Sequence, residues 1–226
     1  MYHGAMSAIE ERYREILRNA DSAAAGRSVR LIAVTKTVSP EMIREAYQAG
    51  LRTFGENRIQ EALPKIQALR ELQAEWHFIG HLQSNKARDA VRNFTMIHSV
   101  DSERLLLQIE KEAVKADIRV PVLLELNLGG EESKSGMTAG ALPQILEASA
   151  SLTRTVVRGL MTVPPYLENP EEVRPYFRML RELRDRFRPG YPLLTELSMG
   201  MSHDFVVAIQ EGSTMVRIGT ALFGER

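Results

Sequence analysis

One lysine, Lys36, lies where a protein of alternating strands and helices places its chemistry. It follows the apolar run 31–35, typical of a buried strand, and precedes Ser39-Pro40, typical of the cap and first turn of a helix. A lysine at the carboxyl end of a buried strand is costly unless its charge is paired or lost. A neutral, desolvated lysine amine is a nucleophile for aldehydes. The alternative is a lysine at the edge of the fold that points into water, and this segment leaves both interpretations open.

Arg217 is a second unusual charge in the sequence. Strand alternation puts its side chain on the face opposite Val216 and Ile218. Because that apolar pair should face the surrounding helices, the sequence predicts that Arg217 faces the interior of the fold. An arginine keeps its charge there and needs a partner. That partner could be a structural salt bridge with Glu125 or Glu196, or an acceptor on a ligand.

Two strand ends near the end of the sequence are rich in groups that could bind an anion. Ser198 and Ser202 offer hydroxyls, and Gly200 between them lets backbone approach a ligand closely. Gly219-Thr220 opens a short stretch whose amino end could present free N–H groups. Barrels often bind phosphate in the loops after strands seven and eight. The sequence therefore predicts a phosphate site, although serine and glycine are also common in ordinary turns.

Together these groups suggest one cofactor, pyridoxal phosphate. Lys36 would form the Schiff base, the two loops would hold the phosphate, and Arg217 would donate to the pyridine nitrogen. An arginine donor leaves that nitrogen unprotonated, so the ring is a poorer electron sink than one paired with aspartate. Transaminase-like chemistry is therefore disfavoured.

The elements that must position these residues are short apolar runs that alternate with amphipathic stretches. We count about eight strand–helix units, the number that closes a (β/α)8 barrel. An open doubly wound sheet is the runner-up, weakened because no Gly-x-Gly-x-x-Gly follows the first strand. A capping-box pattern at Ser7 and Glu10 predicts an extra helix through about residue 25. The expected strands are 31–35, 53–55, 76–79, 96–100, 120–128, 156–161, 193–198 and 215–218; helices are expected at 40–49, 102–116 and 171–187.

Composition is that of an ordinary globular protein. The 226 residues are 44% hydrophobic and 26% charged, with Lys+Arg 29 against Asp+Glu 29, so no charge excess points to nucleic acid. The absence of cysteine excludes disulfides and thiolate metal sites. No apolar run approaches the length of a membrane span, and the start lacks the basic and apolar regions of a signal peptide. We expect a short, disordered lead over 1–6, a single domain over 7–226, and residence in the cytoplasm.

From about Leu31 onward the chain resembles the pyridoxal phosphate homeostasis proteins, also called the YggS/PROSC family. Several motifs in the same order over most of the chain make the resemblance specific. They are Ala33-Val34-Thr35-Lys36, Phe54-Gly55-Glu56-Asn57, Trp76-His77-Phe78-Ile79-Gly80, Leu82-Gln83-Ser84-Asn85-Lys86, 130–136, Gly159-Leu160-Met161-Thr162, Ser198-Met199-Gly200-Met201-Ser202 and 213–220.

The resemblance implies a fold, a cofactor and a set of contacts. The fold is a single barrel like the N-terminal domain of alanine racemase, of fold type III, and Lys36 carries pyridoxal phosphate as an internal aldimine. The implied cofactor contacts are Lys36, Asn57, Ser198, Met199, Ser202, Arg217, Gly219 and Thr220. His203 departs from the family pattern, in which an acidic or small polar residue is expected. Members are thought to bind and buffer the cofactor, with effects on amino-acid and keto-acid balance.

Three functions stay open at this point. The first is a monomeric carrier that passes the cofactor to apo enzymes. The second is an amino-acid racemase or lyase with Lys36 as base; racemases of this fold take a second base, a tyrosine, from an added domain and a partner subunit, and here only Tyr166 lies near the site. The third is an aldolase acting on a sugar phosphate. The loop 131–136 could serve as a lid, and His77 and His81 are expected in core or supporting roles rather than as metal ligands.

Overall fold

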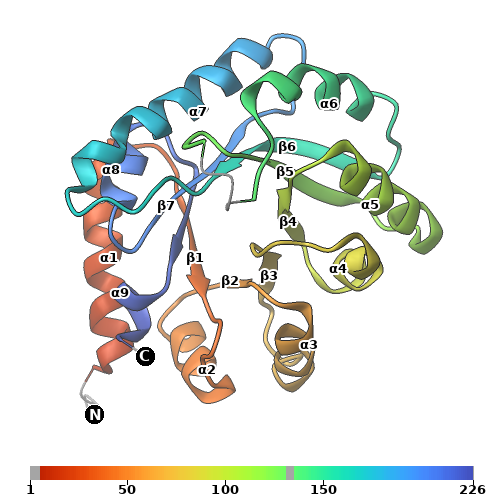
Figure 1. The fold of residues 1–226 in the computed structure, drawn as a ribbon. Helices are drawn as coiled ribbons and strands as arrows, with labels where there is room; N and C mark the ends of the chain where they lie inside the picture. Colours follow the sequence, from red (N-terminus) through yellow and green to blue (C-terminus); the bar gives the residue numbers. More distant parts are fainter. Residues whose placement is uncertain (1–5, 131–134, 226) are drawn as a thin grey trace.

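The computed structural model describes residues 6–130 and 135–225. Its strands run parallel, pair in chain order and close into a barrel (Figure 1). They are β1 (Arg30–Val34), β2 (Thr53–Glu56), β3 (Glu75–Phe78), β4 (Met96–Val100), β5 (Val120–Leu126), β6 (Thr155–Thr162), β7 (Glu196–Met201) and β8 (Met215–Ile218). The predicted (β/α)8 barrel is confirmed. The alternative prediction of an open, doubly wound sheet is wrong, because β1 pairs with β8.

Each strand is followed by a helix that returns the chain along the outside of the barrel. The helices are α1 (Ala8–Ala24), α2 (Pro40–Gln48), α3 (Ile59–Ala68), α4 (Ala87–Asn93), α5 (Glu103–Ala116), α6 (Leu142–Ser149), α7 (Arg174–Phe187), α8 (Phe205–Gln210) and α9 (Thr220–Phe223). Short 3-10 turns precede three of them, at Ser84–Lys86, Ala139–Ala141 and Pro170–Val173. The predicted helix 171–187 therefore begins as a 3-10 turn and becomes α-helical only at Arg174.

The predicted extra helix, α1, completes the outer layer where α9 is too short to do so. Ser7 caps it by accepting a hydrogen bond from the Glu10 N–H at 3.2 Å. The helix lies beside α8 and α9 at one side of the barrel (Figure 1), and the Arg12 guanidinium donates to the Leu222 carbonyl at 3.4 Å. Since α9 has only four residues, α1 extends the apolar packing at this side of the barrel, with Ile9, Ile16 and Ala20 in the outer core.

The core divides into an outer and an inner part, as the alternation of side chains along strands requires. The outer part lies between strands and helices and includes Val216 and Ile218. The inner part fills the barrel with a small set of side chains: Ile32, Met96, Leu123, Met161 and Met215. Arg217 follows Met215 on the inner face, so its predicted inward orientation is confirmed.

Several predicted boundaries are wrong in ways that affect the site. β7 starts at Glu196 rather than at 193, because Leu194 N–H bonds to the Tyr191 carbonyl in a turn. β5 ends at Leu126, and β1 ends at Val34, one residue before the predicted end. Of the expected lead over 1–6, residues 1–5 lie outside the described residues, and the division into 1–6 and 7–226 stays a prediction. No helix in the described ranges is long and apolar enough to cross a membrane.

Candidate cofactor site

Lys36 lies in a turn just beyond the carboxyl end of β1. Its side chain is exposed rather than buried within the barrel. The reason is that the strand ends two residues earlier and the turn carries Lys36 past the hydrogen-bonded part of the sheet. Thr35 N–H still bonds to the Gly55 carbonyl at 2.9 Å, and Thr37 adopts a left-handed φ of 60°. A non-glycine residue in that region is uncommon, and such residues cluster at functional sites.

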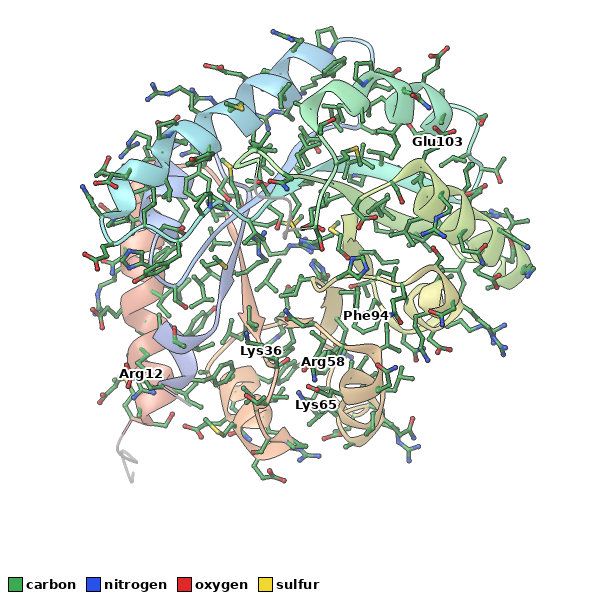
Figure 2. All side chains as sticks on the ribbon, viewed as in Figure 1. Arg12, Lys36, Arg58, Lys65, Phe94 and Glu103 are labelled. Atoms are coloured by element: carbon green, nitrogen blue, oxygen red, sulfur yellow. The ribbon has the colours of Figure 1, made fainter. Side chains whose placement is uncertain are left out.

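A second lysine, Lys65, supports this turn from α3. Its Nζ donates to the Thr35 carbonyl at 2.6 Å and to Glu56 Oε1 at 2.7 Å. The Thr35 hydroxyl donates to the same carboxylate oxygen at 2.6 Å, and the Glu56 side chain is fully buried. Lys36, Arg58 and Lys65 lie on one side of the barrel, near α2 and α3 (Figure 2). Lys65 could not be identified from the sequence, because its contacts depend on how α3 packs against the ends of β1 and β2.

Asn57 directly follows β2 and is half-buried at the carboxyl-terminal end of the barrel, which we call the mouth. Its side-chain Oδ1 is buried and has no hydrogen-bond partner among the described residues. Gly80 packs tightly against its backbone, since a Cβ at position 80 would lie 2.1 Å from the Asn57 carbonyl oxygen. The structure thus holds the Asn57 backbone fixed and leaves its side-chain oxygen as an acceptor for which the described residues supply no donor.

Arg217 is buried inside the barrel, where its side chain is 4% exposed. Its Nη1 donates to Ser198 Oγ at 2.6 Å and its Nη2 to the Thr162 carbonyl at 3.0 Å. Burial lowers its pKa to about 10, while the charges of Glu125 and Asp204 oppose that shift, so the guanidinium stays charged at neutral pH.

The predicted salt bridge of Arg217 with Glu125 or Glu196 is wrong. Glu196 Oε2 accepts from the Thr214 hydroxyl at 2.7 Å at the other end of the strands. Glu125 faces the interior but makes no ion pair with Arg217, and its Oε2 has no partner in the described structure. Burial, with the charge of Asp101, raises the pKa of Glu125 to about 7, and Arg217 acts in the opposite direction.

Ser198 connects Arg217 to two buried histidines. Its Oγ lies 2.9 Å from His98 Nδ1, and His98 Nε2 lies 2.9 Å from His77 Nδ1. Burial lowers the pKa of both rings, that of His98 well below its ordinary value. The expected supporting role of His77 agrees with this position, whereas His98 was not singled out from the sequence.

The loops after β7 and β8 meet, as predicted. Ser202 Oγ accepts hydrogen bonds from the backbone N–H groups of Gly219 at 3.0 Å and Ala221 at 3.2 Å. Gly219 is half-buried and Thr220 exposed, so both can be reached from the mouth. The Met199 side chain instead belongs to the outer core, which leaves only its backbone for a ligand.

Gly200 is required for packing within the fold, and its expected close approach to a ligand stays a prediction. Its φ is +95°, and a Cβ there would lie 2.5 Å from the Ala208 Cβ, so the glycine lets α8 pack against β7. The neighbouring His203, which departs from the family pattern, makes a tilted ring contact with Tyr166, with ring centroids 5.1 Å apart. Tyr166 is 74% exposed, consistent with a loop-packing role. Of the suggested lid, residues 131–134 lie outside the described residues.

Comparison with known proteins defines the class first. A family model described as the N-terminal domain of alanine racemase matches residues 5–226. Alanine racemase of Clostridium difficile 630 has the same fold, with a TM-score of 0.76 at 15% identity, over 96% of this chain and 60% of that chain. The chain is therefore a barrel of the alanine racemase N-terminal class.

Closer relatives narrow the class to one family. The Aquifex aeolicus pyridoxal phosphate homeostasis protein is 54% identical over 198 residues, 87% of either chain. The Pseudomonas aeruginosa protein of the same name is 42% identical over 226 residues, 98% of this chain and 97% of that one. PipY of Synechococcus elongatus PCC7942, solved with pyridoxal phosphate bound, has a TM-score of 0.87 at 38% identity over 96% of this chain and all of that one. The chain belongs to the pyridoxal phosphate homeostasis protein family.

Proposed function

We propose that this protein binds pyridoxal phosphate covalently through Lys36 and contributes to the homeostasis of that cofactor. The observation that carries the proposal is the pairing of β1 with β8, in which Ile32 lies beside Arg217. That register brings the strand leading to Lys36 next to the strand that carries the guanidinium. The relative PipY, which has pyridoxal phosphate bound, supports the same conclusion.

The groups at the mouth fit this cofactor. Arg217 is a charged donor for the pyridine nitrogen, and the orphaned Oδ1 of Asn57 is an acceptor close to the same mouth. We assign the phosphate to Ser202, Gly219 and Thr220, with the Met199 backbone beside them. When bound, the cofactor supplies an aldehyde for the Lys36 amine and an electron-withdrawing ring.

Ser198 is assigned a different task from phosphate binding. Its hydroxyl is fully buried and is already engaged by Arg217 and His98. We therefore assign it to holding the guanidinium in place, while the Lys65–Glu56 pair holds the backbone that carries Lys36. The protein thus binds and orients the cofactor from residues fixed by the barrel itself.

A carrier is favoured over an enzyme because, within residues 6–130 and 135–225, we find no tyrosine placed at the mouth as a second base. Tyr166 is exposed, and its ring contacts that of His203. In addition, an arginine at the ring nitrogen weakens the ring as an electron sink. We propose a monomer in the cytoplasm, with apo enzymes that use pyridoxal phosphate as recipients.

One observation favours the alternative of a racemase or lyase. Glu125 has a pKa of about 7, so its carboxyl group could accept and return a proton at neutral pH. Deuterium exchange at the α-carbon of a panel of amino acids tests this alternative. Exchange that is lost in Glu125→Gln and in Lys36→Ala would establish the enzyme, and no exchange with any amino acid would leave the carrier.

The proposed function is tested by borohydride reduction and peptide mass spectrometry of protein saturated with pyridoxal phosphate. We expect a visible absorbance band that bleaches on reduction, with the added mass on the peptide containing Lys36. Lys36→Ala should lose both, and Lys111→Ala, on the exposed surface of α5, should keep both. An adduct on Lys65 instead of Lys36, or no adduct at all, would refute the proposed attachment.

A further inference from the structure

A continuous line of polar side chains crosses the interior of the barrel. It begins at Arg217 in the mouth, passes through Ser198, His98 and His77, and ends near Glu75 at the start of β3. Each of the first three links is 2.6–2.9 Å long. The last, from His77 Nε2 to Glu75 Oε2, is a longer contact of 3.7 Å.

The contacts at the two ends of this line favour one direction for the protons along it. A guanidinium has no lone pair to accept with, so Ser198 Oγ accepts from Arg217. The hydroxyl therefore has its own proton to donate, and the ring nitrogen that it contacts, His98 Nδ1, accepts it. A neutral imidazole that accepts at Nδ1 carries its proton on Nε2.

The same reasoning continues through the second ring. His98 Nε2–H donates to His77 Nδ1, so His77 also carries its proton on Nε2 and presents it to the Glu75 carboxylate. Every donor points from the cation at one end to the anion at the other. In the reverse order Ser198 Oγ would accept from both Arg217 and His98, and its own buried proton would have no acceptor among the contacts described. His77 Nε2 would also turn a lone pair toward the Glu75 carboxylate.

The charges around the line agree with two neutral rings. His98 is fully buried and faces the cation Arg217, and Arg30 disfavours its protonated form as well. Burial has the largest effect on the pKa of His77 and lowers it; Glu75 raises this pKa and Arg30 lowers it further. Since Arg30 Nη1 also binds Glu75 Oε2 at 2.6 Å, that carboxylate is already partly neutralised.

We propose that His98 and His77 are positioning residues, fixed as Nε2–H tautomers, that align Ser198 and thereby hold the Arg217 guanidinium in place at the mouth. The effect on pyridoxal phosphate rests on the proposed function, whereas the tautomers do not. Because Ser198 can donate only one proton, losing its acceptor at His98 frees the hydroxyl to rotate away from the guanidinium.

The first test measures the tautomers directly in protein as purified. Long-range 15N–1H correlation spectra distinguish protonated from unprotonated ring nitrogens in each of the five histidines. We expect His77 and His98, assigned by loss of their signals in single variants, to carry the proton on Nε2 and to stay neutral across the neutral pH range. A proton on Nδ1 of either ring, or a pKa near the ordinary value of histidine, would overturn the proposed direction of hydrogen bonds along this line.

The second test separates positioning from mere packing. His98→Leu removes the acceptor and the donor, whereas His98→Gln keeps one of each. We expect His98→Leu to weaken pyridoxal phosphate binding by about tenfold and to shift its visible absorbance, with His98→Gln restoring most of both. His203→Leu, at an exposed ring, is the control.

The two tests also keep this inference apart from the proposed function. If His98→Leu lowers only thermal stability and leaves affinity and absorbance unchanged, the positioning role is wrong. If the unaltered protein binds no pyridoxal phosphate, the proposed function fails, and the spectra still decide whether His77 and His98 are fixed as Nε2–H tautomers.

Discussion

At the amino-terminal end of the barrel, Glu110 accepts hydrogen bonds from three successive backbone N–H groups, whereas at the carboxyl-terminal end Glu125 has an oxygen without any partner in the described structure. We call these regions the rim, formed by Glu110 and residues 153–155, and the mouth, formed by Lys36, residues 56–57, Glu125 and Arg217. At the rim the chain enters β6. At the mouth the polar side chains lie at the carboxyl ends of the strands.

The difference lies in how each region satisfies its charges. At the rim, burial raises the pKa of Glu110, but the N–H groups of Thr153 and Thr155 outweigh it and lower that pKa to about 2. At the mouth, the unpartnered buried atoms include Glu56 Oε2, Asn57 Oδ1 and Glu125 Oε2. At the rim the unpartnered buried atom is a neutral hydroxyl, Thr155 Oγ1, and the Glu110 carboxylate is satisfied by the fold. At the mouth two carboxylates and an amide each keep an oxygen without a partner among the described residues, which makes them candidates for contact with a ligand.

The largest expected effect tests how far the mouth depends on one cation. Lys65→Met should lower the free energy of unfolding by about 3 kcal/mol, because it leaves the buried Glu56 carboxylate without its ion-pair partner. Urea denaturation measures this loss. Lys115→Met removes an exposed ion pair with Glu112 and should cost less than about 1 kcal/mol. Adding Glu56→Gln to Lys65→Met should recover most of the stability; failure to recover it would mean that packing, not charge, is what Lys65 supplies.

The next effect separates binding from stability at the mouth. Arg217→Met should weaken pyridoxal phosphate binding by about 100-fold, the value of a charge-assisted hydrogen bond. The free energy of unfolding should change by less than about 1 kcal/mol, since an apolar side chain of similar length replaces a costly buried charge. Absorbance titration and urea denaturation measure the two quantities, with Arg44→Met, an exposed partner of Glu71, as control. A large loss of stability with unchanged affinity would mean that Arg217 stabilises the fold and does not bind the cofactor.

At the rim, Glu110→Gln should lower the free energy of unfolding by about 2 kcal/mol at neutral pH. The folded-state pKa of about 2 lies below the ordinary 4.5, so the contribution is present above pH 4.5 and is lost as pH falls toward 2. The variant and the unaltered protein should therefore converge in acid. Glu103→Gln, which changes an exposed contact with Gln144, should have little effect at any pH.

The smallest effect has the opposite sign. The folded-state pKa of Glu125, about 7, lies above the ordinary 4.5, so this carboxyl lowers stability as pH rises from 4.5 through 7. Glu125→Gln should therefore gain about 1 kcal/mol at pH 8 and nothing at pH 4. A pH series of urea denaturation measures the difference. A loss at pH 8 would mean that the carboxylate has a partner at the mouth and that the contrast with the rim fails.

Much of the fold could be predicted from the sequence because it depends on local patterns. Alternation along β8 gave the inward direction of Arg217, and the Ser7 cap gave the start of α1. The strand at 193–198 failed because the apolar residues Leu193 and Leu194 belong to a turn, and apolar composition alone does not distinguish the two.

The site was predicted less completely, since its contacts join residues distant in the chain. Lys36 and Arg217 stood out as charges beside apolar strands. Lys65 and His98 did not, because each acquires its role from the packing of other elements against it. Two buried polar residues on neighbouring strands, His77 and His98, were the one available signal. Barrel closure would have been needed to relate them to Ser198, 100 positions away from His98.

The closure of the barrel by β1 and β8 also sets when the site can exist during synthesis. Lys36 leaves the ribosome long before β8 is made, so a growing chain exposes the amine without the guanidinium that pairs beside it in the finished sheet. Joining the first strand to the last is the most entropically demanding contact in the topology. The proposed capture of the aldehyde by Lys36 in its proper orientation is therefore a property of the completed ring, and a truncated or stalled chain offers only an ordinary surface lysine.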